Sequence, residues 1–391
     1  MKEKESKWVQ LFWSFFKIGL FSYGGFMSMI AFSKKEVVDK NHFVSEEDFQ
    51  NGIAYVSLLP GPTALNFCGY IGFLFLGNIG MFLAVFAASL PSIVLLWLIA
   101  WLYHDGFSPE QITPYFKWIP FGIASIILHT GINLLSRHPY AKKWFFTLIT
   151  FLLFVLSPVG TTLTLIILIV AVTMYHLLTA SNIRSGKLHF NGKIVFASVL
   201  IIAIILIPMQ GLSHSPIGDF LKISKYSLGL LGGGYVFIPL MDDLLVNVEA
   251  WLPSNVFYDG IAFGQITPGP IMISMFFFGY YVHGAFGAFM YFLGIVLLPM
   301  IITRFFAHSF RSLISNSLLK NTFSFIRLVV LSAILFSAWD IFSKSINIEN
   351  YMNLSIGIIL TGGLFALQHY KIFNVFHVIG TCILIGIIFA G

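Results

Sequence analysis

The tripeptide Pro-Gly-Pro occurs twice in this chain, at residues 60–62 and 268–270, and both copies lie within strongly apolar stretches. A proline inside a helix removes a backbone donor and clashes with the preceding turn, so neither stretch can continue as one regular helix. Inside a membrane, the backbone groups freed by such a break must find partners within the protein. Two breaks of identical sequence therefore predict one structural unit that is present twice.

The similarity extends beyond the tripeptide. When residues 12–62 are aligned without a gap with residues 220–270, 14 of 51 positions are identical. The pairs that membrane composition alone does not supply are Lys17 with Lys225, Gly24-Gly25 with Gly232-Gly233 and, at the same offset, Pro91 with Pro299. We expect the duplication to include at least the first four helical segments of each half.

The composition identifies the class of protein. Hydrophobic residues make up 58% of the 391 positions and charged residues only 10%, too few to cover the surface of a soluble protein of this size. We therefore expect the lipid bilayer around this chain and no nucleic acid. Cys68 and Cys382 stand alone in apolar runs and predict no disulfide or metal site, and nothing indicates a cofactor. The N-terminal segment reads as a retained first span rather than a signal peptide.

Thirteen apolar runs approach the length of about 20 residues that a spanning helix needs. They lie at about 11–33, 50–76, 78–103, 113–135, 143–157, 159–180, 194–210, 218–241, 256–282, 284–307, 321–340, 352–369 and 372–390. The run at 194–210 has no counterpart in the repeat. The sequence thus predicts an all-α polytopic membrane protein with a first repeat at 1–190, a linker transmembrane helix within 191–215 and a second repeat at 216–391, each repeat having about six helical segments.

Six crossings and one linker helix bring the chain into the second repeat from the opposite side, so the repeats are expected to be inverted. Cytoplasmic loops collect Lys and Arg, and an N-terminus inside gives 13 such residues inside against 5 outside. The outside group includes Lys34, Lys35 and Lys40. One loop does not follow the rule for positive charge, because residues 242–255 are placed inside yet carry acidic residues and no Lys or Arg.

Inverted repeats with broken helices are a transporter architecture, with the substrate near the middle of the membrane. Each break predicts a half-helix that begins at Pro62 or Pro270 and presents its first free amides to an anion. The alternative is a structural kink packed against neighbouring helices. The polar residues that could contact substrate are Ser57, Thr63 and Asn66 in the first copy and Gln265, Thr267 and Ser274 in the second. Each of these side chains could equally bond its own helix backbone.

The paired lysines and glycines complete the predicted site. Lys17 and Lys225 could offset the charge of an anion, or their ammonium groups could extend to the lipid headgroups. Gly24-Gly25 and Gly232-Gly233-Gly234 could unwind a helix beside the ligand or permit close helix packing. Asp259 and Asp340 are the acidic candidates for proton coupling, and both could instead be interfacial.

These residues resemble the chromate ion transporter family in its two-domain, long-chain form. The second half carries the closest likeness: residues 232–240 read Gly-Gly-Gly-Tyr-Val-Phe-Ile-Pro-Leu, and residues 259–270 read Asp-Gly-Ile-Ala-Phe-Gly-Gln-Ile-Thr-Pro-Gly-Pro. The first half departs from the pattern at Phe26, where the family usually has Pro, and at Phe43, where a Trp is customary.

The resemblance implies export of chromate across the bacterial inner membrane, which confers chromate resistance. From the broken helices we expect a secondary transporter that works by alternating access, and from the charge pattern an N-terminus in the cytoplasm. The implied partner is a small inorganic anion, chromate or possibly sulfate, and a homodimer is compatible with the sequence. A transporter of sulfate or another small anion is the first alternative. An intramembrane enzyme is the second, and it is disfavoured because the chain has no HExxH, Walker A or GxSxG motif.

Overall fold

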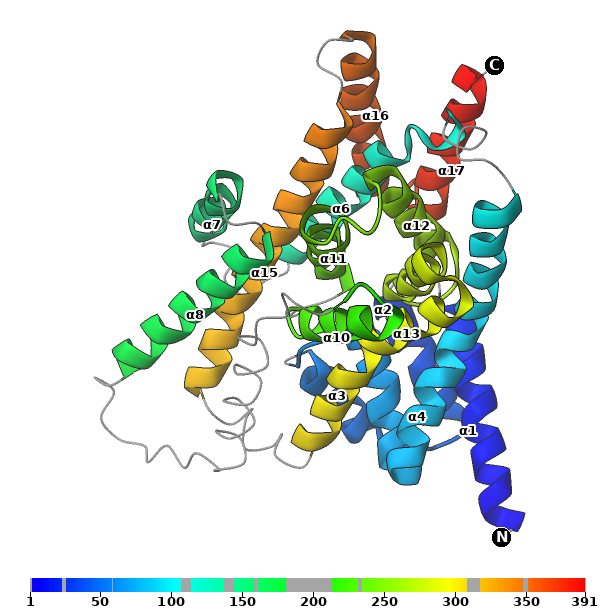
Figure 1. Cartoon of the computed structure of the whole chain (residues 1–391). Coiled ribbons are helices and arrows are strands. Elements are labelled where there is room, and N and C mark those ends of the chain that lie inside the picture. Colours follow the sequence, from blue (N-terminus) through cyan, green and yellow to red (C-terminus); the bar gives the residue numbers. More distant parts are fainter. Residues whose placement is uncertain are drawn as a thin grey trace.

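The computed structural model describes the arrangement of residues 2–22, 26–57, 59–106, 114–136, 144–157, 161–180, 213–230, 234–307, 317–346 and 351–390 (Figure 1). These residues form helices and turns without a strand, which confirms the prediction of an all-helical protein. Within them, four helices are long and apolar enough to cross a membrane: Thr63–Gly106, Pro114–Ser136, Ile271–Phe306 and Ser324–Ser345. Most of the predicted linker at 191–215 lies outside the described residues.

The helices of the two halves follow each other in a similar order. The first half contains α1 (Lys2–Phe21), α2 (Phe26–Ser33), the π-helix η1 (Lys34–Lys40), α3 (Glu46–Val56), α4 (Thr63–Trp101), the π-helix η2 (Leu102–Gly106), α6 (Ile119–Ser136), α7 (Trp144–Leu156) and α8 (Thr161–Ala180). The second half contains α10 (Pro216–Ser227), η4 (Gly234–Val236), α11 (Phe237–Asp242), the π-helix η5 (Asp243–Val248), α12 (Ser254–Ile266), η6 (Ile271–Ile273), α13 (Ser274–Phe306), α15 (Ser317–Ser345), α16 (Tyr351–His369) and α17 (Val375–Ala390).

The long helix α4 is folded back on itself. Leu76 and Gly77 have non-helical backbone angles, and Gly77 has a φ of 67°. A Cβ atom on Gly72 would lie 2.3 Å from the carbonyl oxygen of Gly80, although eight residues of straight helix would separate these positions by about 12 Å. The chain therefore reverses at Gly77, between the two segments predicted at 50–76 and 78–103.

Helix α13 reverses in the same way at its own glycine. His283 and Gly284 have backbone angles close to those of Leu76 and Gly77, with a φ of 66° at Gly284. Here a Cβ atom on Gly279 would lie 2.3 Å from the carbonyl oxygen of Gly287. The two reversals separate short first arms from long second arms, and only the second arms are long enough to span a bilayer.

The first predicted span, 11–33, is a hairpin rather than a crossing. Asn41 follows α2 and η1, yet its Nδ2 donates to Ser14 Oγ at 3.1 Å, and Gln10 Nε2 donates to Asn41 Oδ1 at 3.3 Å. The chain thus ascends in α1 and returns alongside it to the side on which it began. The hydrophobic length of this run was long enough for a span, but the contacts of Asn41 with α1 show that the run does not cross as one helix.

The predicted span at 50–76 is a second hairpin, with Pro-Gly-Pro at its tip. Helix α3 has 11 residues, about 16 Å, which is roughly half of a hydrocarbon core about 30 Å thick. The rings of Phe43, before α3, and Phe75, at the end of the first arm of α4, are 4.3 Å apart. Both ends of the hairpin therefore lie together, and each arm is too short for a full crossing.

The second half repeats these two hairpins. Lys222 Nζ, in the middle of α10, binds Glu249 Oε2 at 2.7 Å just after η5, and the Trp251 ring lies 5.2 Å from the ring of His214, which precedes α10. The Trp251 and Tyr291 rings are 5.8 Å apart, which places the base of α12 next to the second arm of α13. The assignment of the acidic loop 242–255 to the inside was therefore wrong, because this loop lies on the side where α10 begins.

The hairpins also revise the distribution of positive charge. Lys34, Lys35 and Lys40 lie on the same side as the N-terminus, so their assignment to the outside was wrong. This change raises the expected inside total from 13 to 16 and lowers the outside total from 5 to 2. The two wrong assignments, of the loop 242–255 and of the three lysines, have one cause: a hairpin was counted as a crossing in each half.

The long second arms of α4 and α13 run in opposite directions. Arg304, near the end of α13, donates to Asn78 Oδ1 at 2.7 Å, just after the reversal in α4. At the other end, Asp105, beyond the end of α4, contacts the Tyr280 hydroxyl at 3.5 Å, just before the reversal in α13. Because each reversal meets the far end of the other arm, the two arms are antiparallel (Figure 1).

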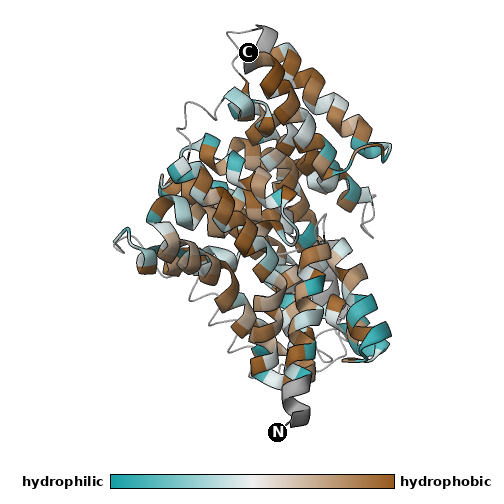
Figure 2. Cartoon of the chain, turned by 90° about the vertical axis from the view of Figure 1, so that its right-hand side faces the viewer, coloured by the Kyte–Doolittle hydropathy of each residue, from teal (hydrophilic) through white to brown (hydrophobic). Residues whose placement is uncertain are grey.

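The remaining helices form two peripheral pairs that pack on the long helices. Helices α7 and α8 lie against α15, where Ser332 Oγ donates to the Thr147 carbonyl at 3.1 Å. Helices α16 and α17 lie against α6, where Gln368 Nε2 donates to Ser125 Oγ at 2.9 Å. Hydrophobic residues predominate along most of the helices (Figure 2). Many large apolar side chains are exposed, among them Trp97, Leu156 and Ile359, as expected for contact with lipid.

Candidate functional site

The first Pro-Gly-Pro break is held by the second half of the chain. Gly61 has a φ of 103°, a conformation that favours glycine, and its amide donates to the Leu230 carbonyl at 2.8 Å. A Cβ atom on Gly61 would lie 2.2 Å from Pro299 Cβ in α13. Pro60, Gly61 and Pro62 are all buried. The break therefore requires glycine both for its backbone conformation and for its close approach to Pro299.

The second break has matching contacts with the first half. Gly269 has a φ of 104°, and its amide donates to the Ser22 carbonyl at 2.8 Å. The hydroxyl of Ser92, in α4, donates to the Pro268 carbonyl, and a Cβ atom on Gly269 would lie 2.6 Å from Ser92 Oγ. Pro268, Gly269 and Pro270 are also buried.

These contacts join the tips of all four hairpins. The donors Gly61 and Gly269 are separated by the repeat offset, and so are the acceptors Ser22 and Leu230. Each break thus hydrogen-bonds a residue that lies just beyond the first helix of the opposite half: Ser22 follows α1, and Leu230 lies three residues after the end of α10. The sequence did not single out Ser22, Leu230 or Ser92. Ser22 and Leu230 are nevertheless paired by the repeat offset, and each lies two residues before a predicted glycine pair.

The start of each half-helix leaves buried amides without a backbone acceptor. Pro62 caps α4, and the first backbone bond of the new helix runs from Asn66 N to the Pro62 carbonyl at 2.8 Å. The amides of Thr63, Ala64 and Leu65 have no backbone acceptor among the described residues, and all three residues are buried. Three amides at a helix start are the arrangement predicted from the sequence.

The second half-helix begins as a short 3₁₀ turn. Ile273 N donates to the Pro270 carbonyl at 3.0 Å, so this amide is occupied, although the first amides of the half-helix were expected to be free. The amides of Ile271 and Met272 have no backbone acceptor within the described part of the chain, and both residues are buried. Buried backbone donors are almost always paired, so a partner for these amides is required.

The predicted polar side chains mostly bond the backbone near the breaks. Thr267 Oγ1 donates to the Gly264 carbonyl at 3.2 Å, and Ser274 Oγ donates to the Ile271 carbonyl at 2.7 Å. Asn66 Nδ2 donates to the Pro60 carbonyl at 3.0 Å, which closes the first break. These three side chains therefore stabilise the broken backbone.

Two buried polar atoms beside the breaks have no partner among the described residues: Asn66 Oδ1 and Ser22 Oγ. Gln265 is half-buried at the end of α12. Gly234 lies close to the start of the second half-helix, because a Cβ atom on Gly234 would be 3.7 Å from the side chains of both Ile271 and Met272. Gly24, Gly25, Gly232 and Gly233 lie outside the described residues.

The two predicted lysines differ in their surroundings. Lys17 is exposed on α1, so the structure does not place it among the buried residues of the breaks. Lys225 is half-buried near the end of α10, which ends at Ser227 just before the break region. The pairing of these lysines in sequence is therefore not matched by equal burial.

Of the acidic candidates for coupling, Asp259 is the more enclosed. It lies in α12 and is 4% exposed, and Tyr103 donates its hydroxyl to Asp259 Oδ2 at 2.8 Å. Asp340 is paired with Lys344, whose Nζ lies 2.7 Å from Asp340 Oδ2. Asp340 is therefore neutralised locally, whereas Asp259 is held by a neutral donor.

A cavity of about 550 Å³ lies away from the breaks, between α6, α7, α15 and α16. Its walls are almost entirely apolar, with Leu128, Phe151, Trp339 and Phe342 among the lining residues. An inorganic dianion would lose its hydration there without gaining donors, so this cavity does not suit such a ligand. The breaks suit such a ligand better, because among the described residues their first amides have no backbone acceptor.

Comparisons with known proteins agree with this architecture. The family model described as "Chromate transporter" matches residues 9–178 and again residues 219–387. An uncharacterized transporter of Methanocaldococcus jannaschii is 27% identical over 362 residues, which covers 88% of this chain and 89% of the relative. A chromate transport protein of Pseudomonas aeruginosa is 25% identical over 372 residues, or 93% of this chain and 87% of that protein.

A chromate transport protein of Cupriavidus metallidurans is 24% identical over 291 residues, covering 71% of this chain and 69% of the relative. No solved structure matches the chain significantly. The family model covers most of the sequence, in two regions that correspond to the two sets of hairpins. The chain therefore belongs to the chromate transporter family and is a membrane transport protein rather than an enzyme.

Proposed function

We propose that this protein exports chromate from the bacterial cytoplasm across the inner membrane by alternating access, as a secondary transporter whose N-terminus is cytoplasmic. The family description and the names of two relatives support chromate as the substrate. The excess of Lys and Arg on the N-terminal side supports the orientation. Export would give the cell resistance to chromate.

We further propose that the chain consists of two inverted-topology repeats joined by one linker transmembrane helix. The antiparallel second arms of α4 and α13 support the inversion, and the reciprocal bonds from Gly61 to Leu230 and from Gly269 to Ser22 support a two-fold relation. Two matches of one family model support the duplication. An inverted pair can open its central site to either side by exchanging the conformations of its halves.

The observation that carries the assignment of the site is a set of buried amides that lack a backbone acceptor among the described residues: those of Thr63, Ala64, Leu65, Ile271 and Met272. They belong to buried residues at the tips of hairpins that reach the middle of the membrane. The positive end of a helix dipole stands behind each set, so an anion is a favourable partner. Chromate is a tetrahedral oxyanion with four acceptor oxygens, which amides from both breaks could bind.

The sharpest test removes a single amide while keeping the helix start. Proline is tolerated at the first position of a helix, where the preceding residue is extended. Pro62 and Pro270 are both extended, with ψ values of 90° and 137°. Thr63→Pro and Ile271→Pro each delete one free amide, and the matched controls Thr63→Val and Ile271→Val keep it.

The loss of one hydrogen bond to a charged ligand costs about 1.5–3 kcal/mol, or roughly 10- to 100-fold in affinity. We expect Thr63→Pro and Ile271→Pro to raise the chromate concentration for half-maximal uptake into proteoliposomes by that factor, while the valine controls stay within about 3-fold of wild type. Unchanged chromate transport by both proline variants, in protein that elutes as wild type does from a sizing column, would rule out the amides as ligands.

Sulfate has the same shape and charge as chromate, so the substrate must be tested directly. Radiolabelled sulfate and chromate are to be compared in the same proteoliposomes, with pH and membrane potential imposed separately. We expect chromate uptake to saturate at lower concentration than sulfate uptake. Sulfate transport without chromate transport would retain the amide site but replace the substrate.

A further inference from the structure

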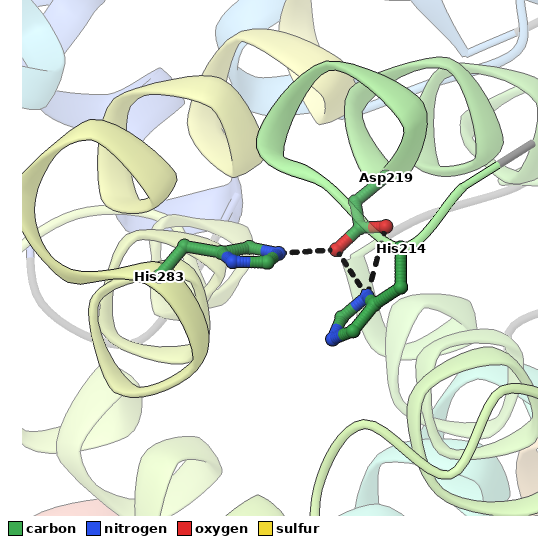
Figure 3. A group of neighbouring side chains, drawn as sticks. All are labelled: His214, Asp219 and His283. Carbon is green, nitrogen blue, oxygen red and sulfur yellow. Dashed lines mark hydrogen bonds and ion pairs between the residues drawn. The ribbon is translucent and has the colours of Figure 1, made fainter.

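A cluster of metal-ligating side chains lies away from the Pro-Gly-Pro breaks. His214 precedes α10, Asp219 lies in its first turn, and His283 stands at the reversal in α13 (Figure 3). His283 Nε2 is 2.8 Å from Asp219 Oδ2, and His214 Nδ1 is 3.1 Å from the same oxygen. The three ligand atoms lie within 4.8 Å of one another. Two imidazoles therefore converge on one carboxylate.

The neighbours of the cluster hold these side chains in place. The Tyr291 hydroxyl donates to Asp219 Oδ2 at 2.8 Å. The Trp251 ring stacks on His214 at 5.2 Å with an interplanar angle of 19°. Asp219 itself is completely buried, whereas the His214 side chain is 49% exposed. Tyr291 and Trp251 thus hold the cluster in place, and the cluster is accessible on the side of His214.

The fold does not need this cluster, because the first half builds the same hairpin without it. The backbone angles at Leu76, φ −130° and ψ 19°, nearly equal those at His283, φ −136° and ψ 16°. At the repeat offset, Asp219 corresponds to Leu11, which is also completely buried. A buried carboxylate is costly where a leucine suffices, so the polar group indicates a specific role.

We propose that His214, Asp219 and His283 bind a divalent transition-metal ion of the Zn²⁺ type. Two imidazole nitrogens and one carboxylate oxygen are a donor set for zinc, with a remaining position for water. Ligand bonds of about 2.0–2.1 Å in a tetrahedral site place ligand atoms roughly 3.4 Å apart, which small movements from the observed separations achieve. Tyr291 orients the carboxylate from the second layer, as partners of metal ligands commonly do.

The site lies at the membrane face opposite to the N-terminus. His283 is at the reversal of α13, which meets the far end of α4, whereas the reversal of α4 meets the end of α13. A metal ion here would link the N-terminal end of α10 to the reversal in α13. No equivalent link joins Leu11 and Leu76, since both are apolar. The ion therefore fastens one half of the transporter and leaves the other without it.

The test is metal binding by the purified, full-length protein after removal of any polyhistidine tag. Co²⁺ titration followed by visible absorption reports a four- or five-coordinate site, and Zn²⁺ competition gives the affinity for zinc. The ligand variants are His214→Ala, Asp219→Asn and His283→Leu, the last introducing the residue found at the first reversal. The matched control is His104→Ala, because His104 Nδ1 lies 2.7 Å from Asp105 Oδ1 in an exposed pair that offers only two ligands.

We expect wild type and His104→Ala to bind a single equivalent of Co²⁺ that Zn²⁺ displaces, and the three ligand variants to bind at least about 100-fold more weakly. Tyr291→Phe is expected to keep the site with affinity lowered about 10- to 100-fold. His214 is exposed, so its variant tests the site even where a buried substitution fails to fold. The absence of Co²⁺ and Zn²⁺ binding by wild type, or wild-type affinity in His214→Ala, overturns the proposal.

Discussion

The contact between Gly269 and Ser92 allows a quantitative test of how the two halves meet. In Gly269→Ala, the new methyl group would lie 2.6 Å from Ser92 Oγ, well inside the ordinary contact distance of 3.4–4 Å. The residue would also keep a φ of 104°, which side chains other than glycine rarely adopt. Backbone strain contributes about 1–3 kcal/mol and the steric overlap about 1–3 kcal/mol. The total destabilisation is therefore about 2–6 kcal/mol.

Ser92→Ala separates these two contributions. It removes the hydroxyl that causes the overlap and sacrifices one hydrogen bond, to the Pro268 carbonyl, worth about 0.5–1.5 kcal/mol. In the double variant the strain and the lost bond remain, but the overlap disappears. We therefore expect the double variant to be about 1–3 kcal/mol more stable than the sum of the single effects predicts.

The assay is reversible unfolding in mixed detergent micelles, with the free energy of unfolding compared for the four proteins of the cycle. Gly284→Ala is the matched control: its φ is 66° and nothing lies within 4 Å of the added Cβ atom, so strain acts there without overlap. It should show no coupling to Ser92→Ala. Additivity of Gly269→Ala and Ser92→Ala within about 0.5 kcal/mol would refute the close approach of the second break to α4.

Three further predictions concern other parts of the molecule. Tyr103→Phe should lower the free energy of unfolding by about 1–3 kcal/mol, because it leaves the buried Asp259 carboxylate without its donor, whereas Tyr280→Phe, at an exposed contact of 3.5 Å, should change it by less than about 0.5 kcal/mol in the same assay. In intact cells, a membrane-impermeant thiol reagent should label His104→Cys and Asn255→Cys, which we place outside, but not Lys35→Cys, which we place inside. The native Cys68 and Cys382 are buried and should give little background labelling. Labelling of Lys35→Cys would refute the first hairpin. Asn66→Ala should reduce chromate uptake and destabilise the protein by about 2 kcal/mol or more, because the Pro60 carbonyl loses its buried donor, and unchanged uptake and stability would contradict that role.

The sequence predicted the class of protein and most helix positions, because hydrophobic length and Pro-Gly-Pro are local signals. The boundary expected between 76 and 78 coincides with the reversal at Gly77. Local signals could not distinguish a crossing from a hairpin, since both need a similar number of apolar residues. That distinction rests on contacts such as Asn41 with Ser14, which join residues far apart in the chain.

The candidate site was predictable to a similar degree. The break positions and the free amides at Thr63 and Ile271 follow from the rules of helix starts. The acceptors at Ser22 and Leu230 do not, because a backbone carbonyl has no sequence signature of its own. Lys17 and Lys225 match in sequence yet differ in exposure, because burial depends on which neighbours each helix receives.

The reciprocal hydrogen bonds at the breaks also bear on how the protein is made. During synthesis the first half enters the membrane while the Gly61 amide has no partner, since Leu230 has not yet been polymerised. An unpaired amide in the bilayer interior costs several kcal/mol, so the nascent first half is an incomplete folding unit. The bond from Gly61 to Leu230 can form only after the second half has been made, so each half completes the broken helix of the other.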